Sequence, residues 1–502
     1  MSKKQRTAIN PTREENFPKW YQSVVREADM AEMAHVRGCM VIKPWGFGIW
    51  ENIQQILGQQ IKDCGVKNAY FPLFVPLSYI EKEAQHVEGF AKEMAVVTHH
   101  RLENTENGLK PSGELTEPLI VRPTSETIIG ESFASWIQSY RDLPLKINQW
   151  CNIVRWEMRP RVFLRTSEFL WQEGHTAFAT AKEAYDDTIQ MLKIYKDFSQ
   201  ERLAMPVIDG VKPSYDKFPG AIDTYCIEAM MQDGKALQAG TTHNLGTNFS
   251  KAANIMFTDT DGEQKHAHTA SWGVSTRLIG GVIMTHADDN GLRLPPEIAP
   301  AQIVIIPIQR GKDEQEDAQV LEYAKKLKDS FKGLTFGKFN TKVNVELDDT
   351  LIKSSTKKWN WVKKGVPIQI EVGPRDIPEN KFVARLRSEE TYEKHFLTID
   401  QIKTEIPKFL ETIQKTYFDQ AKERLDSSIK EVDSFDELKD LFAKDYKGFV
   451  LAPWNPCDEE DVRLKELKIT IRCVPFEYKK EDKKCILTGE DTNIKAIFAK
   501  SY

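Results

Sequence analysis

The first third of the chain carries apolar residues at helical spacing, followed by an extended stretch. The positions that fall on one helical face are Ile49, Ile53, Ile56, Leu57 and Ile61. Gly65 suits the end of that helix, because glycine accepts the backbone conformation found after a helix C-terminus. Residues 69–76 then predict a strand. Taken alone, this pair is typical of an ordinary amphipathic helix packed on a core.

A regular alternation of strand and helix begins after residue 300. It predicts a strand at 302–308, a helix at 313–331, a strand at 342–346, a helix at 352–364 and a strand at 366–372. Such alternation is typical of a small α/β domain whose helices connect the strands as crossovers. From Thr398 the chain becomes helical and densely charged, and it ends in short apolar runs at 448–452 and 494–498.

Turn-forming residues separate these regions. Those between the first and second regions are Gly291, Pro295, Pro296 and Pro300. A chain of 502 residues exceeds one ordinary core, so we expect about three domains. We place the first at residues 1–290, the second at 296–400 and the third at 401–502. The first is rich in His, Trp and Arg and mixes polar residues into apolar segments, which suits an active site.

Composition and charge exclude several classes of protein. Apolar residues make up 40% and charged residues 28%, the balance of a globular protein. No apolar stretch approaches the roughly 20 residues that a membrane helix needs, so we expect no membrane association. Residues 1–7 are basic, but the apolar middle of a secretory signal does not follow them. The net charge of -5 argues against a protein coated in positive charge, yet leaves room for local basic patches.

The cysteines predict a reducing environment. They are odd in number, scattered and without any CxxC pair: Cys39, Cys64, Cys151, Cys226, Cys457, Cys473 and Cys485. A disulfide framework is therefore not expected, and a cytoplasmic location fits better.

The strongest candidate for a site is a hairpin predicted between Ile147 and His175. Alternate residues of a strand share one face, so Arg155 and Glu157 would point the same way. The returning strand adds Phe169, Trp171, Glu173 and His175, and the loop between adds Arg159, Arg161 and Arg165. Burying such charges without partners is costly, so we expect them to surround a ligand with phosphate, carboxylate and a flat ring. The alternative, a solvated charged hairpin, would expose the two aromatic rings without cause.

The segment at 121–126 leads directly into a helical pattern. Thr124 and Glu126 there could accept hydrogen bonds from a ligand ammonium group. The simpler alternative is that Thr124 or Ser125 caps the helix, with Glu126 in its first turn.

Two later segments are also candidates. Residues 238–246 place Gln238, Thr241 and His243 between glycines, although a turn with a satisfied histidine would read the same way. A strand at 266–272 and a helix at 274–285 would place Arg277 in a first helical turn, where the helix N-terminus favours phosphate. His266 alternates with a second histidine, but no third metal ligand has suitable spacing. Neither GxxxxGK[ST] nor a strand-to-helix GxGxxG is present, so arginines and a sheet would have to hold a nucleotide.

In this order the four segments resemble the motifs of class II aminoacyl-tRNA synthetases. The long helix and the stretch with Pro72 resemble motif 1, the hairpin resembles motif 2, and Gly273 with Arg277 resembles motif 3. The runs RPTSET at 122–127, WQEGHT at 171–176 and VGPRD at 372–376 are most similar to prolyl-tRNA synthetases of the eukaryotic and archaeal type. The resemblance covers nearly the whole chain. It implies an α+β catalytic domain on an antiparallel sheet, an α/β anticodon-binding domain and a small α+β C-terminal domain.

The resemblance implies a proline--tRNA ligase that forms prolyl-adenylate from ATP with Mg²⁺ and transfers proline to tRNA(Pro). It assigns catalysis to Arg155, which would bridge the proline carboxylate and the α-phosphate, and to Arg277, which would meet the γ-phosphate. The implied proline-binding residues are Thr124, Glu126, Arg155, Trp171, Glu173, His175 and His243. The implied ATP-binding residues are Arg155, Glu157, Arg165, Thr166, Phe169, Gln238, Thr241 and Arg277. A homodimer is also implied, through motif 1.

The resemblance extends to the second domain. Candidates for reading the anticodon are Glu371, Arg375, Lys381 and Arg385. A nearby helix interleaves lysines with two tryptophans and suggests a surface for phosphates and stacked bases: Lys353, Lys357, Lys358, Lys363, Lys364, Trp359 and Trp361. A charged helix face with two packed tryptophans is an equal alternative. The terminal Tyr502 is expected to pack near the active site, as this end does in the family.

Two departures from related proteins are expected. A four-cysteine zinc site of the C-terminal domain retains only Cys457 and Cys485, with Asn455 and Leu487 near the other positions, so we expect no zinc and no other bound metal in the protein. The stretch 175–266 is needed for the pocket, which leaves no place for an inserted editing domain. Two competing hypotheses are another class II synthetase, such as one for threonine or histidine, and a non-catalytic tRNA-binding paralogue. The motif wording argues against the first, and the retained Arg155, Arg277 and Glu126 argue against the second.

Overall fold

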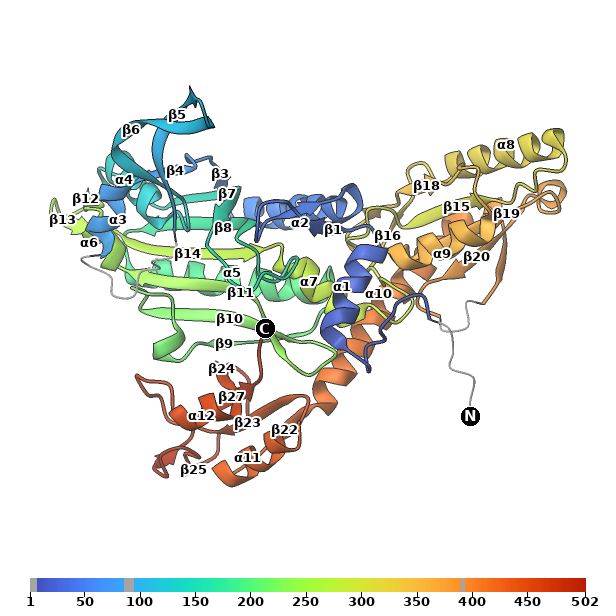
Figure 1. Ribbon diagram of the computed structural model, residues 1–502. Helices are drawn as coiled ribbons and strands as arrows, with labels where there is room; N and C mark the ends of the chain where they lie inside the picture. Colours follow the sequence, from blue (N-terminus) through green and yellow to red (C-terminus); the bar gives the residue numbers. More distant parts are fainter. Residues whose placement is uncertain (1–6, 85–93, 390–392) are drawn as a thin grey trace.

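The structure, a computed structural model, describes residues 7–84, 94–389 and 393–502. Figure 1 shows one large sheet with helices behind it, a smaller sheet with helices to one side, and a C-terminal region that continues the large sheet downwards. The basic residues 1–6 considered above lie outside the described part of the chain.

The large sheet is mostly antiparallel. Within the described residues its strand order is β22-β23-β27-β24-β9-β10-β11-β14-β8-β7-β3. Its central strands are β7 (Leu145–Val154), β8 (Glu168–Phe178), β14 (His268–Ser275), β11 (Ala236–Gly246), β10 (Asp223–Met230) and β9 (Val207–Val211). The short β3 (Lys67–Asn68) adds a parallel edge beside β7. The predicted antiparallel sheet of the first domain is confirmed.

One face of this sheet is covered by α5 (Ala181–Glu201). The helix begins with a capping box between Thr180 and Glu183. Its Tyr195 hydroxyl lies 2.6 Å from the side-chain amide of Gln172 in β8, and its ring meets that of Trp272 in β14. Because neighbouring residues of a strand face opposite sides, Trp171 and Glu173 project from the other face. That uncovered face carries the candidate site.

The remaining elements of the first region support this sheet. The helices are α1 (Phe17–Glu27), α2 (Pro44–Asp63), α3 (Leu77–Ala84), α4 (Glu126–Trp136), α6 (Asn248–Ala252) and α7 (Arg277–His286). The minor strands are β1 (Ala31–Met33), β2 (Met40–Ile42), β4 (Phe74–Pro76), β5 (Ala95–Thr105), β6 (Gly108–Val121), β12 (Met256–Thr258) and β13 (Gln264–His266). The predicted apolar face of α2 is confirmed, since Ile49, Ile53, Leu57 and Ile61 are buried.

Several predicted boundaries were wrong. The stretch 69–76 is a strand only at β4, because side chains bind the backbone that a sheet would use: Phe71 donates its N–H to Gln149 and accepts from Arg122. The helix expected from residue 274 starts at Arg277, since β14 stays paired with β8 through Ser275. Residues 238–246 belong to strand β11, so the alternative interpretation of this segment as a turn is wrong.

The second region confirms the predicted α/β pattern. Its sheet has the order β18-β15-β19-β20-β21 among the described residues, with parallel pairing at β15 and antiparallel pairing from β19 onwards. The elements are β15 (Ile303–Pro307), α8 (Glu314–Ser330), β16 (Thr335–Phe336), β17 (Thr341–Lys342), β18 (Val345–Leu347), α9 (Ser354–Lys364), β19 (Ile368–Val372), β20 (Lys381–Leu386) and β21 (His395–Thr398). The single strand expected at 342–346 is divided between β17 and β18.

The long helix α10 (Ile402–Ser427) joins the second region to the third. Its first half packs into the core of the second region through Ile406, Leu410 and Ile413. The later elements are β22 (Ile429–Glu431), α11 (Phe435–Ala443), β23 (Phe449–Pro453), α12 (Val462–Leu467), β24 (Thr470–Pro475), β25 (Lys483–Lys484), β26 (Asp491–Thr492) and β27 (Lys495–Ala499). Strand β24 pairs with β9, so the C-terminal region shares one sheet with the first region.

Two expectations about insertions and membranes can be compared with this fold. The residues between β8 and β14 form α5, three strands of the large sheet, α6 and a small hairpin, and so contain no further domain. Of the helices in the described ranges, none combines the length and apolar character required to span a lipid bilayer.

Candidate active site

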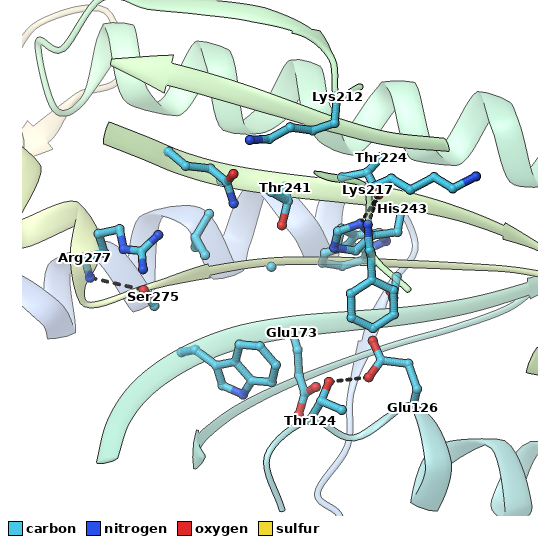
Figure 2. Close-up of a pocket in the computed structure, with 18 of the residues that line it drawn as sticks. Thr124, Glu126, Glu173, Lys212, Lys217, Thr224, Thr241, His243, Ser275 and Arg277 are labelled. Carbon is cyan, nitrogen blue, oxygen red and sulfur yellow. Dashed lines mark hydrogen bonds between the residues drawn. The ribbon is translucent and has the colours of Figure 1, made fainter. Parts of the chain in front are cut away.

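A cavity of about 350 Å³ opens on the uncovered face of the large sheet, over β8, β10, β11 and β14. The lining residues that the sequence also identifies are Thr124, Glu126, Arg155, Phe169, Trp171, Glu173, His175, Gln238, Thr241, His243 and Arg277. In Figure 2, Glu126 and Arg277 lie at opposite ends of this cavity. Segments more than 150 residues apart in sequence therefore meet around one space.

The Glu126 end of the cavity depends on the buried Arg122. Its Nε and Nη1 donate to the carbonyls of Asn152 (2.8 Å) and Phe71 (2.7 Å), which fixes the chain before Thr124. Ser125 is the N-cap residue of α4, and Glu126 is the first residue of the helix. The Thr124 hydroxyl donates to the Glu126 carboxylate, so both oxygens face one place in the cavity. Two close acceptors suit a ligand that carries an N–H or ammonium group.

Glu173 is a buried carboxylate at the centre of a hydrogen-bond network. The Ser125 hydroxyl and Gln149 Nε2 each donate to its Oε1 at 2.5 Å, and His175 Nε2 donates to its Oε2 at 3.0 Å. Burial raises the pKa of Glu173, but the hydrogen bonds and the charge of His175 outweigh it, and the net pKa is lowered. Burial likewise lowers the pKa of His175, and Glu173 raises it to a net value above normal. The two form a buried ion pair in the cavity wall.

Arg155 enters the cavity just after β7 ends at Val154. The inference that it shares a strand face with Glu157 was wrong, because both residues lie beyond the strand. Its Nε donates to the Pro123 carbonyl at 2.8 Å, and its guanidinium lies 5.6 Å from the Trp171 ring and 5.9 Å from the Phe169 ring. The enclosing walls lower the pKa of Arg155, while the charges of Glu126 and Glu173 oppose that effect. The result is an oriented cation with its open side toward the cavity.

The far end of the cavity is cationic. Arg277 is the first residue of α7, and its Nε donates to the Leu164 carbonyl at 3.3 Å. Burial lowers the pKa of Arg277 to about 10, and repulsion from Arg165 and Arg155 adds to this effect. Several cations that repel one another favour an anionic ligand between them.

His243 lies between the two ends on β11. It contacts the Thr224 hydroxyl through Nδ1 at 3.0 Å, and the Phe218 ring lies 4.7 Å from its own. Burial lowers the pKa of His243 to about 3, assisted by the charges of His175 and Arg155, so the ring is neutral at pH 7. A neutral imidazole can shape the cavity without adding charge.

Three residues assigned to ATP do not line the cavity. Glu157 and Arg165 form a loose ion pair at 3.9 Å on the loop after β7, and the Thr166 hydroxyl donates to the Glu168 carbonyl at 2.7 Å. Conversely, sequence reasoning missed the lining residues Lys212, Asp216, Lys217, Phe218, Thr224, Ser271 and Ser275. The turn after β9, which supplies the first four of these, carries no motif that would have revealed them.

The C-terminal residue Tyr502 docks beside the loop between β7 and β8. The Tyr502 hydroxyl donates to Asp233 Oδ2 at 2.7 Å, and its N–H donates to the Ala236 carbonyl at 3.1 Å. Arg165 Nη2 reaches the terminal Tyr502 oxygen at 3.4 Å. Tyr502 therefore contacts the loop between β7 and β8 through Arg165, in line with the expected packing of Tyr502 near the active site.

The resemblance implies adenylate formation, and deleting Ser501 and Tyr502 is expected to reduce it by roughly 10-fold, because Arg165 loses a partner that orders its loop. The measurement is amino-acid-dependent exchange of pyrophosphate into ATP. The matched control is Lys500→Met, which removes only the exposed pair with Asp445. Equal activity of the deletion and this control would show that docking of Tyr502 has no role.

Three of the anticodon candidates lie in strands β19 and β20, and Arg375 lies in the connection between these strands. Glu371 in β19 is buried and accepts from Lys358 Nζ at 2.5 Å and from Arg385 Nε at 3.0 Å. Lys381 pairs with Glu379, whereas Arg375 is exposed. Of the four, Arg375 has the most open side chain for an external ligand.

Most of the lysine-rich helix α9 is engaged within the protein. Lys357 is buried and donates to the Asp348 carbonyl at 2.7 Å, and Lys363 lies 3.2 Å from Glu27. Trp361 donates to Asp348 Oδ2 at 2.8 Å and packs edge-on to Trp45. These contacts favour the structural alternative for this helix, although Trp359 remains exposed.

The two cysteines considered above for a zinc site, Cys457 and Cys485, have other partners. Cys485 accepts from the Asn455 N–H at 3.3 Å, and the Cys457 thiol donates to the Glu459 carbonyl at 3.2 Å. Across the described ranges, no group of three or more His, Cys, Asp or Glu side chains is arranged to hold a metal ion.

Comparisons with known proteins cover the whole chain. Residues 110–286 match the family model of the tRNA synthetase class II core domain (G, H, P, S and T), residues 302–409 match the anticodon binding domain, and residues 435–502 match the C-terminal domain of prolyl-tRNA synthetase. The chain is 54% identical over 507 residues to the proline--tRNA ligase of Paramagnetospirillum magneticum, with 100% of both proteins covered. It is 51% identical over 500 residues to that of Bdellovibrio bacteriovorus, with 99% of both covered. A crystal structure of prolyl-tRNA synthetase from Cryptosporidium parvum, complexed with halofuginone and AMPPNP, matches with a TM-score of 0.88 at 39% identity, covering 99% of this chain and 97% of that chain.

Proposed function

The chain belongs to the family of proline--tRNA ligases, and from this premise we propose that its cavity binds proline at the Glu126 end and ATP at the Arg277 end. As an aminoacyl-tRNA ligase of class II, it activates proline with ATP and transfers it to tRNA. The observation that carries the proposed site is that Arg155 and Arg277 line one cavity with the paired acceptors Thr124 and Glu126.

Proline fits the Glu126 end by charge and shape. Thr124 and Glu126 would accept hydrogen bonds from the imino group, and the Arg155 fork would bind the carboxylate. Trp171 and His243 would line the ring pocket. The ion pair of Glu173 and His175 would hold this wall rigid, because both partners are fixed by buried hydrogen bonds.

ATP fits the remaining space. Phe169 would stack on adenine, Gln238 and Thr241 would bind the nucleotide from β11, and Arg277 would meet the γ-phosphate. Glu157, Arg165 and Thr166 would contact ATP from the bordering loop between β7 and β8. ATP would bring Mg²⁺ with it, because Mg²⁺ commonly binds substrate phosphates and keeps several waters. The described part of the chain contains no group of three or more side chains arranged to hold a metal ion.

The reaction then needs positioning rather than a protein nucleophile. The carboxylate attacks the α-phosphate and pyrophosphate leaves, so negative charge builds up where two anions already repel each other. Arg155 would touch both anions and hold them in line, and Arg277 would stabilise the leaving phosphates.

The other regions are assigned by the same premise. We propose catalytic, anticodon-binding and C-terminal domains at residues 1–290, 296–400 and 401–502, with Glu371, Arg375, Lys381 and Arg385 as the anticodon candidates for tRNA(Pro). A homodimer in the cytoplasm is also proposed.

The test of this function is proline-dependent exchange of pyrophosphate into ATP. We expect exchange with proline as the preferred amino acid. Exchange only with threonine or histidine would indicate another class II synthetase, and no exchange with any amino acid would indicate a non-catalytic paralogue.

Alanine and cysteine are expected to be misactivated at measurable rates. Both are smaller than proline, and a pocket rejects a ligand that lacks a methylene by only about 1–3 kcal/mol. The same exchange assay, run with each amino acid in turn, measures the ratio of kcat/KM values. Failure to detect exchange with either amino acid would contradict the proposed pocket.

The purified enzyme is expected to contain no stoichiometric zinc. Cys457 and Cys485 bind neighbouring backbone groups, and two thiols do not make a closed zinc tetrahedron. Elemental analysis of the protein, purified without chelator, is the measurement. One zinc per chain would contradict the prediction.

A further inference from the structure

Lys212 is a buried cation in the cavity wall to which the proposed function assigns no role. It follows β9 directly, and its side chain is only 2% exposed. It lines the cavity together with Gln238, Thr241 and Arg277, and Figure 2 shows its chain running toward the Arg277 end, away from Glu126. A lysine ammonium is a compact charge with three donors, suited to phosphate oxygens.

The closest buried carboxylate to Lys212 is already occupied. Glu228 of β10 is fully buried and lies 3.5 Å from Lys212 Nζ. Arg472 of β24 takes both oxygens of that carboxylate, through Nη2 at 3.0 and 3.1 Å and Nε at 3.2 Å. A two-point contact with arginine is the stronger of the two, so Glu228 belongs mainly to Arg472.

The remaining partner of Lys212 lies on an open turn. Asp216 Oδ2 accepts from Lys212 Nζ at 2.7 Å, but the Asp216 side chain is 47% exposed. Because the Asp216 partner of this ion pair is half exposed, water screens the interaction and reduces its contribution. Lys212 therefore keeps a buried stem and an ammonium group that a stronger anion can take over.

The same group of charges acts on Arg277. Burial and the charges of Arg165 and Arg155 lower the pKa of Arg277 most, and the charges of Glu228 (raising it) and Arg472 (lowering it) contribute less. Arg472 comes from the C-terminal region, whose strand β24 pairs with β9 immediately before Lys212. The C-terminal region thus contacts Glu228, which lies 3.5 Å from the cavity-lining Lys212, through one buried ion pair.

We propose that Lys212 is a further binding residue for the phosphates of ATP, and that Arg472 is a positioning residue that leaves Lys212 available by occupying Glu228. This proposal rests on the proposed function, since it assigns ATP to the same cavity. Without Arg472, the buried Glu228 carboxylate would draw Lys212 Nζ, now at 3.5 Å, away from the ligand.

The first experiment compares Lys212→Met with Lys196→Met in steady-state exchange assays. Lys196 of α5 is a matched control. It pairs with Asp209 of β9, the strand that precedes Lys212, at 2.8 Å and does not line the cavity. We expect K212M to raise the KM for ATP by roughly 10- to 100-fold over K196M, with the KM for proline changed less than about twofold. Lys212→Arg, which retains the charge, is expected to recover most of the affinity for ATP.

The second experiment tests Arg472. Arg472→Met is expected to raise the KM for ATP by roughly 5- to 20-fold, whereas Arg463→Met, which removes an ion pair with Asp461 elsewhere in the C-terminal region, is expected to leave it unchanged. An R472M variant with the same KM for ATP as R463M would overturn the positioning role.

The outcomes separate this inference from the proposed function. Wild-type enzyme without proline-dependent exchange would refute the function itself. An active wild type with equal KM values for ATP in K212M and K196M would refute only the role of Lys212. A parallel rise in the KM for ATP and for proline would also refute it, because it would indicate a purely structural lysine, as would K212R failing to recover affinity.

Discussion

Replacing Arg155 by methionine is expected to lower kcat/KM for proline activation by about 1000-fold. Arg155 is oriented by the Pro123 carbonyl and by the rings of Phe169 and Trp171, with its open side toward the cavity. Removing one oriented donor from a site where negative charge develops costs roughly 100- to 1000-fold in rate, and Arg155 would serve two anions at once. Proline-dependent pyrophosphate exchange measures the effect.

Two variants control for this result. Arg141→Met removes an exposed arginine of the same region and is expected to retain full activity. Arg155→Lys keeps the charge but loses the two-point fork, so we expect an intermediate loss. An R155M enzyme that retains more than a tenth of wild-type kcat/KM would remove the basis of the proposed mechanism.

Replacing Glu173 by alanine is expected to destabilise the protein by about 3–5 kcal/mol, the usual result of removing one partner from a buried ion pair. The change would leave Ser125 and Gln149 without their acceptor and His175 charged without its partner. Each of these groups is buried, so water cannot replace the lost carboxylate at low cost. Urea-induced unfolding, followed by tryptophan fluorescence, measures the change in the free energy of unfolding.

A matched pair distinguishes burial from charge. Glu106→Ala removes an exposed carboxylate and is expected to change stability by less than about 0.5 kcal/mol. Glu173→Gln keeps the volume and one acceptor oxygen, so its loss should lie between the two. If E173A were as stable as E106A, the network around Glu173 would not hold the cavity wall.

Much of the candidate site followed from the twofold period of a strand. Phe169, Trp171, Glu173 and His175 all line the cavity, as their alternation in β8 predicted. The same rule failed for Arg155, because β7 ends at Val154 and the twofold period holds only while a strand stays paired. Arg155 reached the cavity through a hydrogen bond to Pro123 instead of through the strand face.

The composition of a helix was a weaker guide than the alternation of a strand. In α9 the mixture of lysine and tryptophan was compatible with a nucleic-acid surface and with internal packing. The outcome depended on acidic and aromatic partners from elsewhere in the chain, such as Asp348 and Trp45, whose proximity no local pattern reveals.

The sequence by itself determined the family, the order of the motifs, the α/β pattern of the second region and many of the residue types that line the cavity. These properties depend on local spacing and on which side chains can bind phosphate or carboxylate. Only the tertiary structure decided which charges meet: the pair of Glu173 with His175, the docking of Tyr502 beside Arg165, and the contact of Arg472 with Glu228 across 244 residues. The physical reason is that charge interactions depend on distance and burial in the folded chain, and neither quantity is encoded in local sequence periodicity.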